Sequence, residues 1–146
     1  MRLFVLLILG LLVSGCGSMK MGQEMSGSEY FAVKPIGKVV REEGRTFIVV
    51  QPQYLEAMMG VEDLREIVVV YWFDRNDTAE KRSIMQVHPQ GNKEKPLRGV
   101  FATHSPVRPN LIAISRCRVL SVRENVIEIE GIDAFDETPV IDIKSG

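Results

Sequence analysis

The pattern of hydrophobic and polar positions after residue 32 predicts a domain built mainly of β-strands. Apolar runs rich in Val, Ile and aromatic side chains alternate with turns that contain Gly, Pro, Asn or charged residues. The predicted strands cover residues 35–42, 45–50, 67–73, 81–88, 99–102, 111–122, 126–130 and 140–143. So many strands in so short a chain predict a barrel or a strongly curled sheet, because closure leaves few open edges.

Two segments carry a more specific pattern. Residues 67–73 (IVVVYWF) are continuously apolar, which predicts a central strand buried on both faces. Residues 53–59 have helical spacing and predict one short helix, with Gly60 as its C-terminal cap. The apolar side chains expected on one side of this helix are Leu55, Met58 and Met59.

The first residues predict an export signal rather than part of the fold. A short basic start is followed by an apolar run and by small residues, and the run is shorter than the ~20 residues that a membrane-spanning helix needs. Cys16 directly after Ser-Gly resembles a bacterial lipobox, in which the thiol is lipidated. The prediction is a signal peptide at 1–15, a lipidated Cys and flexible tether at 16–31, and a domain at 32–146. An ordinary signal or an uncleaved anchor is the alternative.

Lipidation of Cys16 predicts a membrane-anchored bacterial lipoprotein on the periplasmic or extracytoplasmic face. The thiol of Cys117 then has no partner for a disulfide, which predicts a small core residue.

Composition excludes several classes of function. A net charge of −1 gives no sign of a strongly basic nucleic-acid binder or a polybasic membrane surface. His88 and His104 are the only histidines, and no Cys/His cluster has metal-ligand spacing. No Gly-rich turn opens a helix after a strand, and no Ser has a nucleophile-elbow context.

The polar segment between two predicted strands, residues 103–110, is the best candidate binding loop. Pro106 and Pro109 restrict their own φ and the conformation of the residue before them, so the loop has few shapes available. A stiff loop presents polar groups to a ligand at little entropic cost. Those groups belong to His104, Ser105, Arg108 and Asn110. The alternative is an ordinary Pro-rich connection with solvated side chains.

Several motifs together resemble the TsaA-like family, also called the TrmO family. Residues 88–92 (HPQGN), 96–103 (PLRGVFAT) and 105–110 (SPVRPN) are similar to its HPRG and RGVFATRSPxRPNPIGLS patterns. Residues 71–73 (YWF) match its LYWF strand, and residues 133–144 (DAFDETPVIDIK) resemble DLLDGTPVLDIK. The resemblance covers residues 33–144.

This resemblance implies a mainly β fold, a single-sheet TsaA-like (YaeB-like) β-barrel with one short helix, usually dimeric. It also implies S-adenosylmethionine as cofactor and N6-methylation of threonylcarbamoyladenosine in tRNA as activity. The positions that it marks for cofactor binding are Glu66, Ile67, His104, Arg108, Asn110, Ile114, Phe135, Asp136, Glu137 and Thr138. Tyr71 and Asp136 are candidates for accepting a proton or a hydrogen bond.

The chain departs from the family pattern at five motif positions, one of which is Leu111 in the place of Pro. His104 stands in place of Arg, Glu66 in place of His, and Glu137 and Ala113 in place of Gly. Arg offers a permanently charged planar fork to a carboxylate, whereas His is only partly charged at neutral pH. Loss of that charge-assisted pair costs about 1.5–3 kcal/mol.

Two further hypotheses stand beside the methyltransferase. S-adenosylmethionine and tRNA are cytosolic, so an exported domain would use the same barrel as a tethered, non-catalytic module for a small nucleoside-like ligand or a protein. Alternatively, the polar residues serve the fold alone: Arg108 pins the loop, Asn110 caps a turn, and Asp136 binds backbone amides.

Overall fold

The computed structural model describes residues 31–146, and Ala32–Gly146 form one compact unit. The predicted signal peptide, Cys16 and most of the predicted tether therefore lie outside the described residues. The strands are β1 (Gly37–Glu42), β2 (Arg45–Val50), β3 (Glu66–Trp72), β4 (Gln86–Val87), β5 (Arg98–Gly99), β6 (Ile112–Arg123), β7 (Val126–Glu130) and β8 (Pro139–Ser145). The one α-helix of the described residues is α1 (Ala79–Arg82), and the 3₁₀ turns are η1 (Pro52–Met58), η2 (Val61–Asp63), η3 (Asp74–Asn76), η4 (Pro89–Gly91) and η5 (Val100–Ala102).

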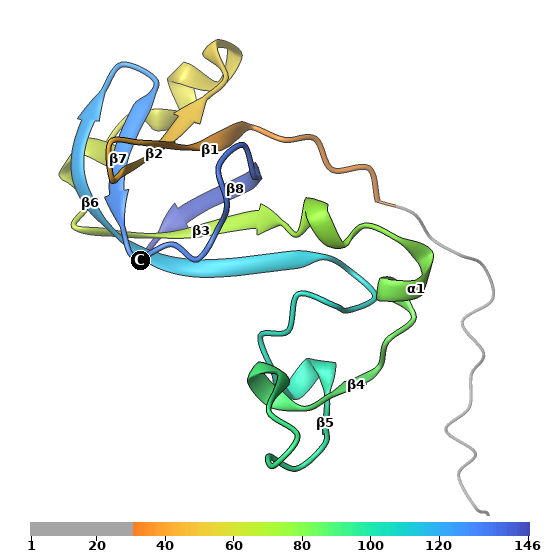
Figure 1. The fold of residues 1–146 in the computed structure, drawn as a ribbon. Coiled ribbons are helices and arrows are strands. Elements are labelled where there is room, and N and C mark those ends of the chain that lie inside the picture. The colour runs from red at the N-terminus through yellow and green to blue at the C-terminus, as the bar shows by residue number, and fades with distance from the viewer. Residues whose placement is uncertain (1–30) are drawn as a thin grey trace, which may run out of the picture. The chain divides into compact units, whose positions relative to one another are not determined.

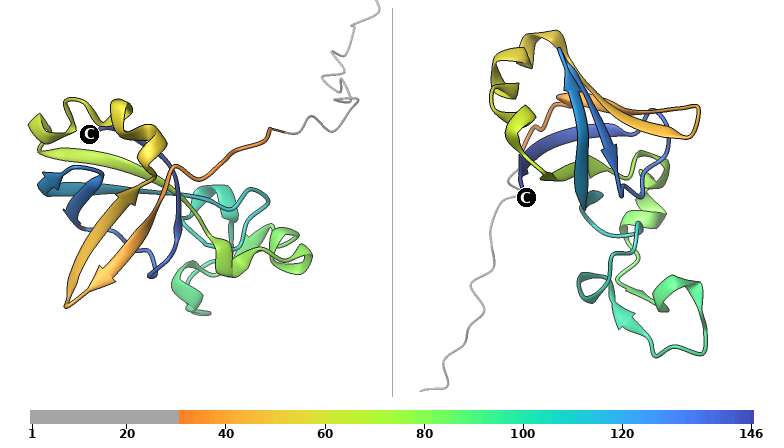
Figure 2. Two further views of the ribbon diagram at one scale, coloured as in Figure 1. Left: turned by 90° about the horizontal axis from the view of Figure 1, so that it is seen from above. Right: turned by 90° about the vertical axis from the view of Figure 1, so that its left-hand side faces the viewer.

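Six strands form a closed antiparallel barrel in the order β1-β2-β7-β6-β3-β8, as Figures 1 and 2 show from three sides. The strand β8 pairs with both β3 and β1, which closes the sheet on itself. The short strands β4 and β5 pair with each other outside the barrel. They belong to residues 84–110, here called the arm, which projects away from the barrel in Figure 1. The predicted barrel is confirmed.

Side chains that alternate along each strand fill the barrel interior. Val39, Ile48, Ile67, Ile127 and Val140 are fully buried, although they come from five different strands. Strand periodicity of two explains the pattern, since alternate residues point to the same face. Cys117 on β6 is also fully buried, as the sequence predicted, and burial raises the pKa of its thiol to about 11.

The prediction that β3 is buried on both faces is wrong. Its burial alternates, with Ile67, Val69 and Tyr71 inside the barrel and Val68 and Val70 only partly covered on the outer side. A barrel strand has one inner face, so β-branched residues on its outer face reflect strand propensity rather than burial.

The predicted helix at residues 53–59 forms as the 3₁₀ segment η1, with a different buried side. Tyr54 and Met58 pack against the core, whereas Leu55 is half exposed and Met59 is 88% exposed. Gly60 follows Met59, the C-cap residue of η1, and has a φ of 87°, the left-handed conformation that commonly ends a helix.

Two predicted strands in and beside the arm are largely wrong. Residues 81–88 contain the end of α1 and only a two-residue strand, because the Thr78 side chain accepts a hydrogen bond from the Lys81 amide and caps a helix. Residues 99–102 contain one strand residue, and η5 follows from Val100. In the described residues, no helix is long and apolar enough to cross a membrane.

Barrel closure brings the backbone of Gly37 against its neighbours on both sides. Gly37 pairs with Val50 on β2 and with Val140 on β8. A Cβ at this position would lie 2.4 Å from the Val49 carbonyl oxygen and 3.0 Å from the Val50 Cα atom. Both atoms belong to the backbone, so no side-chain rotation relieves the clash. Glycine is therefore required for the strands to approach.

We expect the Gly37→Ala variant to lower the free energy of unfolding by about 1–3 kcal/mol, the usual cost of overpacking. The Gly99→Ala variant is the matched control, because a Cβ there meets only the Met85 carbonyl oxygen at 4.0 Å. We expect the control to change stability by less than about 0.5 kcal/mol. Urea unfolding followed through the fluorescence of Trp72, the single tryptophan, measures both. Equal losses in the two variants would contradict the proposed role of Gly37.

Candidate functional site

A large cavity lies where the end of β3, the start of β6, the arm and residues 131–138 meet. Its volume is about 1070 Å³, at the upper end of the range for small-ligand sites. Aromatic, cationic and amide side chains line it together, which suits a ligand with a flat ring and an anionic group. The residues that the argument below uses are Tyr71, Asp74, Arg75, Phe101, His104, Arg108, Asn110, Asp133 and Phe135.

Hydrogen bonds within the arm hold the predicted binding loop in shape. Thr103 Oγ1 donates to the Val100 carbonyl at 3.0 Å and accepts from the Ser105 amide at 3.2 Å. The Arg108 guanidinium donates to the Thr103 carbonyl at 3.4 Å. These short-range bonds add to the restriction from the two prolines, and they leave further guanidinium donors of Arg108 for a ligand.

The helix α1 fixes the other end of the same loop. Arg82 donates to the Pro109 carbonyl at 2.8 Å and to Asp77 Oδ1 at 2.8 Å. Asp77 Oδ2 also accepts a hydrogen bond from the Trp72 indole at 3.2 Å. The hydrogen bonds from Arg82 and Trp72 lower the pKa of the Asp77 carboxyl. The loop is thereby tied to the end of β3.

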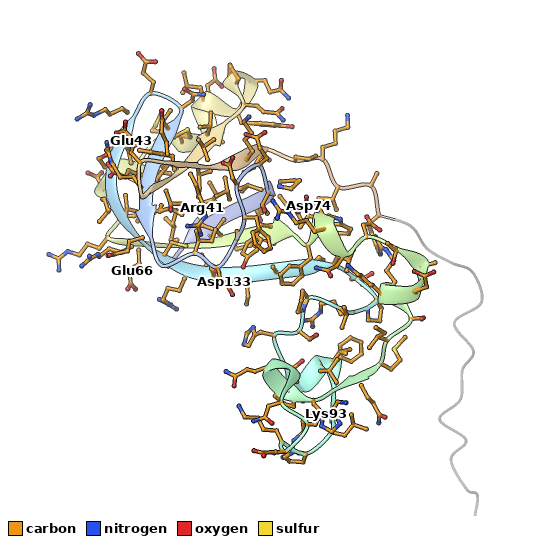
Figure 3. The ribbon with its side chains drawn as sticks, in the orientation of Figure 1. Arg41, Glu43, Glu66, Asp74, Lys93 and Asp133 are labelled. Atoms are coloured by element: carbon orange, nitrogen blue, oxygen red, sulfur yellow. The ribbon has the colours of Figure 1, made fainter. Side chains whose placement is uncertain are left out.

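Arg41 on β1 holds the segment 131–138 that forms the opposite wall. Its side chain donates to the Ala134 carbonyl at 2.8 Å and to the Ile132 carbonyl at 3.1 Å. Its backbone amide donates to Asp136 Oδ1 at 2.8 Å. Figure 3 labels Arg41 and Asp133 close together on this side of the barrel. The segment therefore presents its side chains to the cavity from a fixed backbone.

Tyr71 and Arg75, two lining residues at the end of β3 and in η3, contact the segment 131–138. The Arg75 guanidinium lies over the Phe135 ring, 4.0 Å from its centroid, so one face of that ring is covered. The Tyr71 hydroxyl donates to the Asp133 carbonyl at 3.0 Å and lies 3.2 Å from Ser115 Oγ. Burial raises the pKa of Tyr71 above its usual value of 10.0. Tyr71 therefore keeps its proton at neutral pH and acts as a hydrogen-bond donor.

The structure brings together six of the ten residues that the resemblance marks for cofactor binding. Four of them lie on or next to the arm, and two on the segment 131–138. They are His104, Arg108, Asn110, Ile114, Phe135 and Thr138.

Four marked residues do not line the cavity. Glu66 begins β3 and pairs with Arg116 at 3.2 Å, at the end of the strand away from Asp74, as Figure 3 shows. Ile67 is fully buried in the core. Asp136 binds the Arg41 amide, and Glu137 pairs with Lys38 at 2.8 Å. The hypothesis that Asp136 bonds a backbone amide therefore agrees with its observed contact.

The two positions where this chain replaces a family glycine, Glu137 and Ala113, have different backbone conformations. Glu137 has a φ of 66°, a left-handed conformation that glycine adopts without strain. Ala113 lies in the extended strand β6 and is buried, so a side chain is accommodated there.

Among the lining residues that sequence reasoning missed, the following carry a charge or an aromatic ring and are exposed: Asp74, Arg75, Phe101 and Asp133. The first two follow β3 in a 3₁₀ turn that the apolar pattern does not predict. The exposure of Phe101 is 80%, although its neighbour Val100 is buried. The sequence predicted a strand at residues 99–102, so the exposure of Phe101 could be recognised only from the observed 3₁₀ turn η5.

The cavity residues fit S-adenosylmethionine in chemistry and in size. Arg108 is a cation for its carboxylate, His104 offers a ring nitrogen as a second donor, and Asn110 offers an amide to polar groups. Phe135, on the face that Arg75 does not cover, offers a flat aromatic surface to an adenine ring. In residues 31–146 no three His, Cys, Asp or Glu side chains form a metal-binding group.

Comparison with known proteins finds relatives of similar sequence. The chain is 43% identical over 114 residues to a probable S-adenosyl-L-methionine-binding protein of Methanocaldococcus jannaschii, covering 78% of this chain and 90% of that one. A similarly named protein of Pyrococcus horikoshii is 45% identical over 116 residues, covering 80% and 82%. A mouse tRNA (adenine(37)-N6)-methyltransferase is 33% identical over 88 residues, which are 60% of this chain and 20% of the mouse protein.

The solved structure of TrmO from Pseudomonas aeruginosa has the same fold. The TM-score is 0.60 at 24% identity, and the match covers 81% of this chain and 56% of that one. The chain thus spans little more than half the length of that TrmO. The family model described as the tRNA-methyltransferase O N-terminal domain matches residues 29–145, nearly all of the described chain. The chain therefore belongs to the tRNA-methyltransferase O N-terminal domain family.

Proposed function

We propose that the chain is an S-adenosylmethionine-dependent methyltransferase that acts on the N6 nitrogen of adenine in tRNA. The observation that carries this proposal is the cavity, which combines flat aromatic faces with Arg108, His104 and Asn110. The archaeal relatives are named as S-adenosyl-L-methionine-binding proteins, and the mouse relative as a tRNA (adenine(37)-N6)-methyltransferase. The threonylcarbamoyl form of the acceptor follows from the family resemblance.

The reaction asks the protein chiefly to position two reactants. When bound, S-adenosylmethionine would supply a sulfonium methyl group for transfer to the acceptor nitrogen, with the C–S bond breaking as the N–C bond forms and its electron pair staying on the sulfur of the thioether product. Arg108 and His104 would hold the carboxylate of the cofactor, and the stiffness of their loop keeps the reacting atoms in line. The acceptor nitrogen then loses its proton to a base.

We propose Asp133 as that base. Asp133 and Asp74 are the two carboxylates that line the cavity among the described residues. The backbone of Asp133 is held by Tyr71, and the carbonyl groups on either side of it are held by Arg41. Asp74 begins the exposed turn η3 and lacks these supports. A carboxylate on a fixed backbone is the better placed proton acceptor, because general bases depend on position.

A second candidate function follows from the N-terminal sequence. We propose that Cys16 is lipidated after removal of a signal peptide at 1–15, and that residues 16–31 tether the barrel to the extracytoplasmic face of a membrane. The support is the Ser-Gly-Cys pattern after an apolar run. A domain there would bind a small nucleoside-like ligand, since tRNA is cytosolic.

We also propose a homodimer. The family resemblance supports it, as does Leu120, an apolar side chain on β6 that is 50% exposed and lies outside the cavity lining. Sedimentation of a monomer at micromolar concentration would rule it out.

The cofactor proposal predicts that the protein binds S-adenosylmethionine in a calorimetric titration, and that His104→Arg binds it about ten times more tightly. The gain reflects a permanent charge and a planar fork opposite the carboxylate. The His104→Ala variant is the control and should bind no more tightly than the wild type. A flat trace at millimolar concentration for the wild type and for His104→Arg would reject the cofactor site.

The base proposal predicts that Asp133→Asn lowers kcat at least about 100-fold in methyl transfer to a tRNA substrate, within the usual effect of a general base. Affinity for S-adenosylmethionine should stay within about threefold, because Arg108 and His104, rather than Asp133, are proposed to hold the carboxylate of the cofactor. Asp74→Asn is the matched control and should keep kcat within about threefold. Equal losses in both variants would reject Asp133 as the base.

The location proposal predicts that cells supplied with radioactive palmitate label the wild-type chain but not Cys16→Ser. The labelled protein should sediment with membranes, whereas Cys16→Ser should not. Wild-type protein that is unlabelled and soluble in the cytosol would favour the tRNA methyltransferase. Labelled protein on the outer side of the membrane would favour the second candidate function.

A further inference from the structure

We infer that the arm, residues 84–110, is an RNA-docking surface that contacts phosphates with Lys93, Lys95 and Arg98 and stacks the acceptor base on Phe101. This inference rests on the proposed methyltransferase function and names the surface that would hold its macromolecular substrate.

The first support is the uneven distribution of charge. The arm contains four Lys or Arg residues and one acidic residue, Glu94, which gives it a formal charge of +3, whereas the whole chain carries −1. The barrel and the terminal segments therefore carry the excess of acidic groups. RNA phosphates are attracted to the arm in preference to the rest of the surface.

The second support is that the positive charge of the arm is not neutralised within the described residues. Six ion pairs occur there, and all of them lie on the barrel or on α1 and its flanking residues. Lys93 and Arg98 are exposed and belong to none of the six. Lys95 donates to the Gln90 side chain, a neutral partner. Figure 3 shows Lys93 at the end of the arm far from the barrel.

The third support is the position of Phe101 between this charged surface and the cavity. Phe101 lines the cavity and is 80% exposed, although its neighbour Val100 anchors η5 in a buried position. Arg98 precedes Phe101 by three residues, so their Cα atoms are at most about 11 Å apart. That distance is within the span of one or two nucleotides.

An exposed aromatic ring beside unpaired basic groups is how proteins hold a single-stranded base. An enzyme that modifies a base must take it out of its stack and place it in a pocket. Arg75 already covers one face of Phe135, whereas Phe101 makes no aromatic or cation–π contact with another described residue. Phe101 therefore has a free face for the acceptor base.

The test compares two double variants of the full chain that remove the same charge. Lys93→Gln with Arg98→Gln changes the arm. Arg65→Gln with Arg123→Gln changes two exposed residues, one just before β3 and one at the end of β6, that are also outside the six ion pairs. Fluorescence anisotropy measures the affinity for a tRNA anticodon stem-loop RNA at several KCl concentrations, without S-adenosylmethionine.

We expect the arm variant to bind the RNA at least about tenfold more weakly at 0.1 M KCl, and the slope of log K against log salt to fall by about 1.4. The barrel variant should change affinity less than about twofold. Phe101→Ala should weaken binding about tenfold, and Phe101→Tyr should retain it, because tyrosine keeps the flat ring.

Calorimetry with S-adenosylmethionine separates this inference from the proposed function. Affinity for S-adenosylmethionine should be unchanged in the arm variant, which also shows that the variant is folded. Equal losses of RNA affinity in the two double variants, or no RNA binding by a wild-type chain that binds S-adenosylmethionine, would overturn the arm as the docking surface. Failure to bind S-adenosylmethionine would instead overturn the proposed function, whatever the RNA result.

Discussion

The close approach of β1 to both of its neighbours is the constraint on which the rest of the structure depends. Gly37 lets the backbone of β1 approach β2, where a side chain would strike the Val49 carbonyl, and the same residue pairs with Val140 of β8. The same contact continues past the strand ends, since the Val39 amide donates to the Thr138 carbonyl at 2.9 Å and its carbonyl accepts from the Glu137 amide at 2.8 Å. Closure thus fixes the segment 131–138 as well as the barrel. One wall of the cavity is therefore a consequence of how the sheet closes.

The sequence predicted the barrel strands well because they follow a local rule. Residues 45–50 and 126–130 were predicted with the observed bounds, since alternation and turn residues such as Glu43 and Gly44 are read from neighbouring positions. The arm was predicted poorly for the opposite reason. Its fold depends on contacts between distant residues, such as Arg82 with the Pro109 carbonyl, and on a two-residue sheet too short to have a pattern. The β-branched outer face of β3 misled the burial prediction, since propensity and burial favour the same residues.

The candidate site was predictable to a similar extent and for similar reasons. The polar loop with Arg108 and Asn110 was found because prolines and polar residues in a short segment indicate a stiff connection. Asp74 and Asp133 were not found, because a carboxylate after a strand or in a loop is usually a solvated residue. Only the fold brings these two, more than fifty positions apart, to one cavity. The structural hypothesis for the polar residues also has support, since Arg108 and Asp136 bind backbone atoms. A structural contact does not remove a binding role, because a guanidinium has five donors.

The positions of the departures from the family pattern decide how much they matter in this chain. Glu66 and Glu137 are outside the cavity and each forms an ion pair on the surface of the barrel, so their added charge does not face a ligand in the cavity. Ala113 is an extended residue that needs no glycine. His104 is the departure that combines a changed charge with a place beside Arg108 in the cavity lining. Of the substitutions that separate the chain from its family motif, this one bears directly on the electrostatics of the cavity. Imidazole lacks the planar fork of five donors that a guanidinium presents, so His104 is a weaker partner for a ligand carboxylate than the family arginine would be.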